Sequence, residues 1–368
     1  MKILYLLFHG FYASNGISKK VIAQIEALKN EGAEVNVCHY VVTSDAHRQW
    51  MVDSEILEDL GTGFKAKMLK RIYFRPILNY IKETKPDYLY LRSFHNANPI
   101  TIHFLNRVRK TGTKILLEIP TYPYDGEYKT LWQKNMLLAD KLFRKSFCKR
   151  VEKIVTFSED DTIFGRPTVK ISNGIDLSKV PVRKVVSHPG ELHLLGVAEI
   201  HFWHGFDRLL KGLCEYYRNS DPETKVYFHI VGLPYGKEEE DAITNGIHGI
   251  EKYVIRHGAL YGDALTDVFD ACDIGIGSLG RHRSGVKTMK SLKNREYAAR
   301  GMAFIYSEND PDFDGEPFTM KVPADETPVN IRDIVEFSRK SFSPEEIRKK
   351  TEHLSWDAQM LKVLKSLD

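Results

Sequence analysis

The sequence predicts an α/β protein made of two open, doubly wound domains that face a cleft. Short apolar runs rich in Ile, Leu and Val alternate with amphipathic segments of helical periodicity, which is typical of parallel strands joined by crossover helices. This alternation continues through both halves of the chain. At 368 residues the chain is also too long for one ordinary core, and it fits two domains of roughly 150–200 residues each.

The first half begins with a buried strand followed by an amphipathic helix. Lys2–Phe8 is a short apolar run, and we interpret it as a strand rather than a signal peptide because no small-residue cleavage site follows it. Ser18–Asn30 carries apolar residues at helical spacing, and Gly32 ends that helix. The remaining strands expected in this half are Glu34–Val42, Tyr88–Leu91, Lys114–Ile119 and Ile154–Phe157.

The second half repeats the pattern and ends in helices. Leu192–Ala198 predicts a strand, and Phe206–Tyr217 predicts an amphipathic helix. Ser343 is followed by Pro344 and two acids, which is typical of a capped helix start, and a last helix is expected from Ser355 onward. The further strands expected here are Val226–Val231, Tyr253–His257, Asp273–Gly277 and Met302–Tyr306.

The domain boundary is expected in the stretch Leu177–Glu191, which contains two prolines and scattered basic residues. Residues 1–185 are then the N-terminal domain and residues 186–354 the second domain. Residues 355–368 are expected to form a helix that crosses back and packs on the N-terminal domain.

Composition indicates a folded cytoplasmic protein with no nucleic-acid partner. The net charge is only +4, far from the basic excess of most nucleic-acid-binding domains. No run approaches the roughly 18–20 apolar residues that span a bilayer. The cysteines are widely spaced, so reduced thiols are favoured over disulfides or a zinc site. They are Cys38, Cys148, Cys214 and Cys272.

Several stretches resemble the retaining glycosyltransferase family 4. IVTFSEDD at residues 154–161, followed by ISNGIDLSKV at 171–180, is similar to the end of that family's N-terminal domain. SLKNREYAARGMAFIYSE, Ser291–Glu308, resembles its donor-binding helix and the strand after it. Weaker similarity covers the loop NGISKK at 15–20, Leu194–Leu210 and His257–Gly280.

The resemblance implies the GT-B architecture, in which two Rossmann-like domains face each other, and an activity. The N-terminal domain would hold the acceptor and the C-terminal domain the nucleotide-sugar donor. The enzyme would move a sugar from a nucleotide-diphosphate sugar to a glycan or lipid-linked acceptor, with retention, in polysaccharide or glycan biosynthesis. No cofactor other than the donor substrate is implied.

By the same resemblance Glu296 accepts hydrogen bonds from the ribose hydroxyls, a task that suits an ionised, acceptor-only carboxylate. Ser291, Leu292 and Lys293 are expected at the N-terminus of that helix, where free N–H groups and the helix dipole favour a diphosphate. On the acceptor side, Asn15 and Gly16 resemble the family's glycine loop, where Gly16 would let the backbone approach the acceptor or the donor phosphates. A plain strand-to-helix turn is the alternative.

Two departures from the family pattern affect the donor site. Thr288 stands where the family usually has a first Glu, eight residues before Glu296. Glu199 and His204 stand where an Arg and a Lys usually neutralise the diphosphate. The replacement cations we predict come from the basic run at 281–293, with a solvated basic loop as the alternative. They are Arg283, Lys287 and Lys293, with His204 and Gly205 adding donors at their helix N-terminus.

A third departure affects the acceptor site, where Pro120 lies near the position of a family His. Glu118, Asp125 and Glu127 are the candidates for orienting the acceptor hydroxyl and taking its proton, with His95 as a further acceptor contact. Capping or ion-pair roles for these carboxylates are the alternative. In transferases of this type the departing phosphate is thought to act as the base, so a dedicated catalytic residue is not obligatory.

We predict no required metal, since helix dipoles and cationic side chains replace it in this fold. Asp160-Asp161 and the acidic run Asp310–Glu316 are interpreted as loop caps and turns. Phe64–Arg75 and Lys141–Lys153 are basic amphipathic segments with aromatic residues, which fits peripheral attachment to anionic lipid at the inner face of a membrane. Ordinary surface helices are the alternative.

Two other functions remain open on the sequence alone. A nucleotide-sugar 2-epimerase shares the two-domain fold and would turn over its donor without an acceptor. A catalytically degenerate nucleotide-binding protein would explain Thr288, Glu199 and His204. A dinucleotide oxidoreductase is disfavoured because no G-x-G-x-x-G follows a strand.

Overall fold

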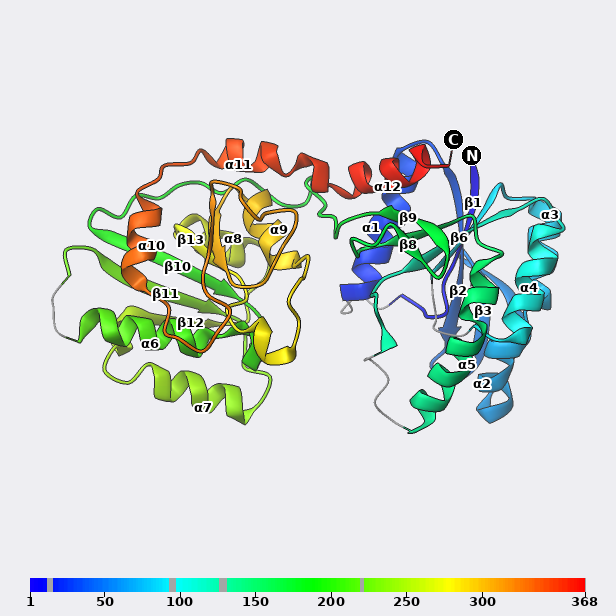
Figure 1. Cartoon of the computed structure of the whole chain (residues 1–368), viewed down its shortest axis with the longest axis horizontal. Coiled ribbons are helices and arrows are strands. Elements are labelled where there is room, and N and C mark those ends of the chain that lie inside the picture. The colour runs from blue at the N-terminus through cyan, green and yellow to red at the C-terminus, as the bar shows by residue number, and fades with distance from the viewer. Residues whose placement is uncertain (12–15, 93–96, 126–130, 219–221, 368) are drawn as a thin grey trace. The chain divides into compact units, whose positions relative to one another are not determined.

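The computed structural model describes residues 1–11, 16–92, 97–125, 131–218 and 222–367. The chain divides into two compact units (Figure 1). Unit 1 is Met1–Ser172 together with Trp356–Asp368, and unit 2 is Asn173–Ser355. The boundary between Ser172 and Asn173 lies before the domain boundary expected at residues 185/186. Both units are α/β with largely parallel sheets, as the sequence predicts.

The described part of unit 1 forms a nine-stranded sheet in the order β4-β3-β2-β1-β5-β6-β7-β9-β8. The strands from β2 to β9 in that order are parallel, and β3, β4 and β8 are added antiparallel at the edges. The strands are β1 (Lys2–Leu6), β2 (Glu34–Val42), β3 (Arg48–Val52), β4 (Glu55–Asp59), β5 (Tyr88–Arg92), β6 (Lys114–Ile119), β7 (Lys153–Thr156), β8 (Thr162–Ile163) and β9 (Arg166–Lys170). The helices are α1 (Gly16–Asn30), α2 (Gly63–Ile72), α3 (Arg75–Thr84), α4 (Pro99–Arg109), α5 (Leu131–Cys148) and α12 (Trp356–Lys365).

The sheet of unit 1 has an apolar core on each face, because successive side chains of a strand point to opposite sides. In β1, Leu4 and Leu6 join the core that includes residues of α3, α4 and α5. Ile3 and Tyr5 join the other core, which is closed by α1 and α12. Figure 1 shows α12 (red) beside α1 (blue) in this unit, and the two helices are in contact.

The described part of unit 2 forms a parallel six-stranded sheet in the order β12-β11-β10-β13-β14-β15. In such a sheet the strand order reverses between β10 and β13, and loops diverge there to leave a crevice. The strands are β10 (Glu191–Val197), β11 (Lys225–Val231), β12 (Val254–Gly258), β13 (Ile274–Ile276), β14 (Ala303–Tyr306) and β15 (Thr319–Lys321). The helices are α6 (Phe206–Tyr217), α7 (Lys237–Gly246), α8 (Gly262–Asp270), α9 (Leu292–Ala299), α10 (Ile331–Ser338) and α11 (Pro344–Lys350). Short 3-10 helices are η2 (Phe202–His204), η3 (Glu251–Tyr253), η4 (Arg281–Ser284) and η5 (Glu352–Leu354).

The strands expected from the apolar runs are present, with small shifts at their ends. β2, β6 and α6 coincide with the predicted ranges, and the Ser343 side chain caps α11 by accepting the N–H of Glu346 at 3.3 Å. The hairpin β3-β4 and the short strands β8, β9 and β15 were not predicted. Among the described residues, no helix has both the length and the apolarity needed to cross a membrane.

Candidate functional site

Three loops meet at the carboxyl ends of adjacent strands in unit 2. The loop after β10 accepts hydrogen bonds from the loop after β13, from Leu279 N to His204 O at 2.9 Å and from Gly280 N to Trp203 O at 3.2 Å. The loop after β13 in turn accepts one from Ser307 N, which follows β14, through Ser278 O at 2.9 Å. These bonds fix a continuous rim at the point where the strand order reverses, which is where doubly wound sheets bind ligands.

Gly205 allows the first two loops to approach so closely. Its φ is +66°, in the left-handed region that favours glycine. A Cβ atom at this position would lie 2.7 Å from Gly280 N and 2.7 Å from the carbonyl carbon of Leu279. Gly205 is also the residue immediately before α6, so the same position sets the start of that helix.

A cluster of four ionisable side chains lies on this rim: His204, Arg281, Lys293 and Glu308. Arg281, Lys293 and Glu308 perturb one another's pKa values, and Lys293 and Arg281 also lower the pKa of His204, so the four groups are within electrostatic range. The Nζ atom of Lys293, the Nε atom of Arg281 and both carboxylate oxygens of Glu308 are buried, and none has a hydrogen-bond partner among the described residues. Buried polar atoms without partners cost free energy. The cluster therefore indicates a site for a polar, charged ligand.

The protonation of these groups follows from burial. Burial, followed by the nearby Arg281, lowers the pKa of Lys293 to about 7. Burial raises the pKa of Glu308 to about 7, although Arg281 and Lys293 act to lower it. Burial, with smaller contributions from Lys293 and Arg281, lowers the pKa of His204 to about 2, so its imidazole is neutral at pH 7.

His204 offers a neutral hydrogen-bond donor at one of the two positions where the resembled family usually has an Arg and a Lys. Its Nδ1 accepts the backbone N–H of His201 at 2.9 Å. A neutral imidazole that accepts at Nδ1 carries its proton on Nε2. The cationic charge of the cluster is thus left to Lys293 and to Arg281, whose guanidinium lies 5.1 Å from the centre of the Trp203 ring.

Helix α9 carries the predicted donor-site residues. Ser291 is buried at its N-cap, but its side chain makes no capping hydrogen bond. The first amides of the helix, beginning at Leu292, therefore have no side-chain cap, and the positive end of the helix dipole lies there. Lys293 and Glu296 are one turn apart on the same side of the helix. Oε1 of Glu296 accepts from Nε of Arg300 at 3.2 Å, and the Glu296 side chain is 35% exposed.

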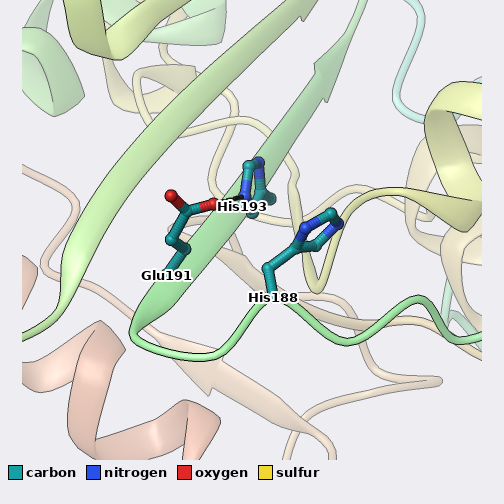
Figure 2. A group of neighbouring side chains, drawn as sticks. All are labelled: His188, Glu191 and His193. Atoms are coloured by element: carbon teal, nitrogen blue, oxygen red, sulfur yellow. Dashed lines mark hydrogen bonds and ion pairs between the residues drawn. The ribbon is translucent and has the colours of Figure 1, made fainter.

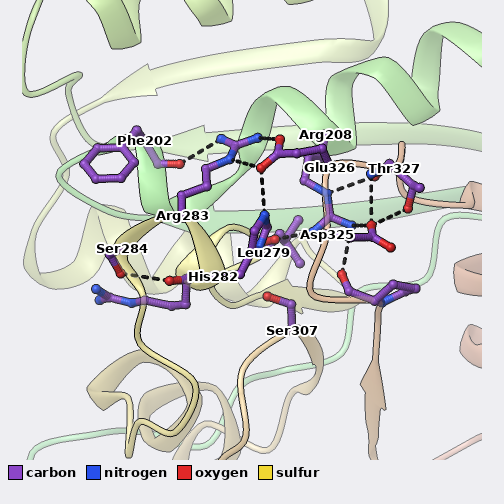
Figure 3. A network of polar contacts seen from close by, with 12 residues as sticks. Phe202, Arg208, Leu279, His282, Arg283, Ser284, Ser307, Asp325, Glu326 and Thr327 are labelled. Carbon is purple, nitrogen blue, oxygen red and sulfur yellow. Dashed lines mark hydrogen bonds and ion pairs between the residues drawn. The ribbon is translucent and has the colours of Figure 1, made fainter.

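Arg283 is occupied by ion pairs. It donates to Glu326 at 2.9 and 2.6 Å and to Phe202 O at 2.9 Å (Figure 3). It also donates to both oxygens of Asp207, at 2.8 and 2.9 Å. The hydrogen bonds with Glu326 and Asp207 raise its pKa further above the usual range. Its charge is therefore already balanced, and it fastens η4 to the loop that carries Glu326.

Arg208 braces the same region from α6. Its fully buried guanidinium donates to Thr327 O at 2.9 Å, to Pro323 O at 2.9 Å and to Leu279 O (Figure 3). The loop at 323–327 is thus tied to the loop after β13. Of the three cations expected from the basic run, Lys293 stands in the cluster, Arg283 is a structural brace, and Lys287 is exposed. Arg281, in the same run, is the cation that the sequence reasoning left out.

In unit 1 the predicted carboxylates lie in different surroundings. Glu118 is fully buried, and its oxygens accept from Arg92 at 2.5 Å, Tyr90 at 2.9 Å and Gln24 at 3.1 Å. Both oxygens of Glu118 therefore already accept hydrogen bonds, inside the core that α1 covers.

Asp125 is more exposed and pairs with Arg144 at 2.8 Å and Lys141 at 3.0 Å. Partial burial acts to raise its pKa, but the hydrogen bonds from Arg144 and Lys141 outweigh it, and the pKa is lowered. Gly16 is the first residue of α1. The other predicted acceptor-side residues, Asn15, His95 and Glu127, lie outside the described residues.

An apolar cavity opens in unit 1 where β1, β5 and β6 end. Phe8, Ala97 and Tyr124, which follow these three strands, line it together with Phe104 of α4 and Phe147 of α5. Asp140 lies in its wall, where it accepts from the Tyr124 hydroxyl at 2.7 Å and from Ala97 N at 3.1 Å. The strand order of this sheet reverses between β1 and β5, so the cavity occupies the corresponding binding position of unit 1.

Comparison with known proteins identifies the fold. No family model matches the sequence, and no curated protein matches it. HepE of Anabaena in complex with UDP superposes with a TM-score of 0.62 at 13% identity, covering 100% of this chain and 99% of that one. The lipopolysaccharide outer core galactosyltransferase WaaB gives 0.59 at 15% identity, with the same coverage.

Two further structures with this fold are a synthase and an epimerase. The catalytic domain of starch synthase IV of Arabidopsis thaliana, bound to ADP and acarbose, gives a TM-score of 0.60 at 13% identity, covering 99% of this chain and 98% of that one. UDP-GlcNAc 2-epimerase of Methanocaldococcus jannaschii gives 0.50 at 9% identity, covering 100% and 99%. The chain has the GT-B fold of nucleotide-sugar glycosyltransferases, as the resemblance implies.

Proposed function

We propose that this protein is a glycosyltransferase of the family 4 type, which moves a sugar from a nucleotide-diphosphate sugar to a glycan or lipid-linked acceptor. The observation that carries the proposal is a pair of basic side chains with buried, unpartnered nitrogens, Nζ of Lys293 and Nε of Arg281, beside an uncapped helix N-terminus at the switch point of unit 2. Such a place suits a diphosphate, which needs both positive charge and amide donors. The complexes of HepE with UDP and of starch synthase IV with ADP support this assignment.

In the proposed donor complex the diphosphate binds against the first amides of α9. Lys293 and Arg281 neutralise it, and the Nε2–H of His204 donates a further hydrogen bond. Glu296 accepts hydrogen bonds from the ribose hydroxyls. Stabilisation of the departing phosphate is usually the largest catalytic contribution in such a reaction, and cations fixed in a desolvated site supply it without reorganisation.

We propose that Glu308 supplies the carboxylate that Thr288 lacks. Thr288 forms a parallel bridge with Asn309, the residue after Glu308, so the two positions lie side by side. The buried, unpartnered oxygens of Glu308 would accept hydrogen bonds from the donor sugar or share a proton with it. Glu199, the other departure, has a side chain that is 71% exposed and pairs with His201 at 3.5 Å, so we give it no donor contact.

The finer chemistry follows the resemblance. We propose retention of configuration, with the departing phosphate as the base, and a transfer step that needs no metal because the cluster and α9 supply the positive charge. The acceptor would bind unit 1, with its apolar portion in the cavity lined by Phe8 and Tyr124. Loss of transfer in excess chelator that magnesium restores would contradict the metal-free step.

Two neighbouring helices of unit 1 support a peripheral membrane location. On α2, Phe64, Met68 and Ile72 recur every four residues and are 77%, 37% and 45% exposed. On α5, Leu138 and Leu142 are 60% and 71% exposed among lysines. Arg71 lies 3.6 Å from the sulfur of Met136, so the two helices touch. Exposed apolar residues beside basic ones favour an anionic lipid surface.

Nucleotide binding tests the donor site. We expect a panel of nucleoside diphosphates to raise the melting temperature of the parent chain, by an amount that grows with the logarithm of concentration over Kd. Glu296→Ala should weaken binding about 10- to 100-fold, since hydrogen bonds to a charged group contribute about 1.5–3 kcal/mol. Glu336→Ala, an exposed carboxylate on α10, is the matched control. Parent-like binding and transfer by Glu296→Ala would rule out the proposed donor site.

Vesicle co-sedimentation tests the membrane contact. Binding to anionic vesicles at low salt should fall on Phe64→Glu combined with Leu142→Glu, because each adds a charge to the proposed contact face. Ile56→Glu, at an apolar residue of β4 that is 60% exposed, should leave binding unchanged. If the parent chain stays in the supernatant, the membrane proposal is discarded while the donor site is unaffected.

The 2-epimerase remains the second candidate, because that enzyme shares the fold. A donor-only assay separates the two. Conversion of the nucleotide sugar without acceptor favours the epimerase, whereas turnover that requires an acceptor favours the transferase. Tight nucleotide binding with neither reaction would indicate a catalytically degenerate protein.

A further inference from the structure

Two histidines and a glutamate converge at the amino end of β10 in unit 2, whereas the proposed donor site lies at the carboxyl ends of the strands. His188 lies in the segment before β10, Glu191 is the first residue of that strand, and His193 is its third (Figure 2). A tight turn brings them together, with Gly190 at φ +79° and Glu191 N donating to His188 O at 2.9 Å. One potential ligand atom from each residue lies within 4.8 Å of the other two.

The contacts of the three side chains fit a shared metal ion. Nε2 of His193 lies 3.1 Å from Oε2 of Glu191, and the rings of His188 and His193 are 4.4 Å apart. No hydrogen bond holds the His188 ring among the described residues, and its Nε2 is buried without a partner. The His188 ring is thus placed beside two ligand groups with no polar contact of its own.

A row of histidines supports His193 from behind. Nδ1 of His193 lies 2.9 Å from Nε2 of His229 on β11, and Nδ1 of His229 lies 2.9 Å from Nε2 of His257 on β12. With the proton of His193 on Nδ1, each ring donates to the next one along the row. The Nε2 lone pair of His193 is then free to bind a metal. Metal-binding histidines are commonly oriented in this way, by a hydrogen bond from their second ring nitrogen.

We propose that His188, Glu191 and His193 bind a divalent transition metal ion, for which Zn²⁺ is the best fit. Two imidazoles and one carboxylate are a typical zinc ligand set, with water in the fourth position of a tetrahedral site. Magnesium and calcium prefer oxygen ligands and suit it poorly. Because the site lies at the amino end of β10, it is separate from the donor site, and its role is to fasten the segment that carries His188 to the sheet.

Metal binding to the full chain tests the proposal. After chelator treatment and dialysis, Zn²⁺ titrated calorimetrically should bind at one site and raise the melting temperature by about 5 °C at a hundredfold excess over Kd. Cobalt in place of zinc should give the visible absorption of a tetrahedral site. His188→Gln should abolish the shift in melting temperature. His229→Gln should weaken binding about 10- to 100-fold through the loss of its support.

His248→Gln, at an exposed histidine of the same unit, is the control and should bind zinc like the parent. Nucleotide binding should not change with zinc, so the outcome is independent of the proposed function. The proposal is overturned if the parent shows no saturable zinc binding. It is equally overturned if folded His188→Gln binds zinc as tightly as the parent.

Discussion

At the scale of single residues, the proposed donor site contains groups that the protein leaves without partners. Arg283 and Arg295 are saturated by carboxylates, whereas the Nζ atom of Lys293 and the carboxylate oxygens of Glu308 are buried with no hydrogen-bond partner among the described residues. Such groups reduce the stability of the free protein. A ligand that satisfies them recovers that free energy on binding, so the site is preorganised at the expense of the unliganded state.

The lowered pKa of Lys293 predicts that nucleotide binding depends on pH. In the free protein Lys293 loses its proton near pH 7, well below its ordinary value of 10.5. A bound diphosphate favours the charged form of Lys293 and the neutral form of Glu308, so binding takes up protons above pH 7. Affinity should therefore fall as pH rises from 7 to 9, by up to about tenfold per unit for each proton taken up.

Calorimetry in buffers of different ionisation heat measures this proton uptake directly at pH 8. Lys293→Met should weaken binding about 10- to 100-fold and flatten the pH dependence. Lys349→Met, at an exposed lysine of α11, is the control and should keep both affinity and slope. Equal affinity at pH 7 and pH 9 in the parent chain would argue against Lys293 as a phosphate ligand.

The residues of the candidate site could be selected from the sequence only where a local sequence pattern marks them. Lys293 and Glu296 lie in a helix with a recognisable start and a family-like motif, so they could be selected before the structure. Arg281 and Arg283 stand two residues apart in one basic run, and nothing local distinguishes them. Only the fold shows that Asp207 and Glu326 neutralise Arg283 and that Arg281 lies beside Trp203.

At the scale of elements, the loops after β10 and β13 form the site because Gly205 lets them touch. Gly205→Ala should reduce nucleotide affinity at least about tenfold, since a methyl group must displace the backbone that leads to Arg281. Gly249→Ala is a matched control, because Gly249 has φ +84° and open space around its Cβ position.

Both glycine substitutions carry the strain of the left-handed region, roughly 1–2 kcal/mol in unfolding free energy. Gly249→Ala should therefore lose stability but keep nucleotide affinity. Chemical denaturation of the two variants measures the cost of backbone strain, and nucleotide titration measures the effect of displacing the loop that leads to Arg281. If Gly205→Ala bound nucleotide like Gly249→Ala, close approach of the loops would not shape the site.

The strands that were predicted are mostly buried, whereas the hairpin that was not predicted is more exposed. β2 and β6 lie inside the sheet and carry mostly buried apolar residues, and their ends were predicted correctly. The hairpin β3-β4 lies at the sheet edge, where Glu55–Asp59 is charged and mostly exposed. It forms because antiparallel pairing with β2 supplies its hydrogen bonds, a tertiary effect that local composition does not carry.

At the scale of the whole molecule, unit 1 depends on a helix that the chain reaches only after unit 2. Trp356, Met360 and Val363 of α12 are buried in the same core as Val21 and Ile25 of α1. Trp356→Ala should lower the free energy of unfolding of unit 1 by about 3–5 kcal/mol. Differential scanning calorimetry should show one transition moved down and the other unchanged.

Nucleoside diphosphate assigns the two transitions, because it should raise only that of unit 2, which carries the donor cluster. Ile347→Ala, at a buried residue of α11 in unit 2, is the reciprocal control and should lower that transition alone. A single transition that both substitutions shift equally would show that the units unfold together.

The late position of α12 in the chain also bears on biosynthesis. The sheet of unit 1 leaves the ribosome with one apolar face covered only in part, by α1, and the rest of that face stays open while all of unit 2 is translated. Domains usually fold in order of their emergence, but here the first sheet is sealed last. Nascent chains of this protein therefore pass through a prolonged stage in which the part of this apolar core that α12 later covers is open to capture by molecular chaperones.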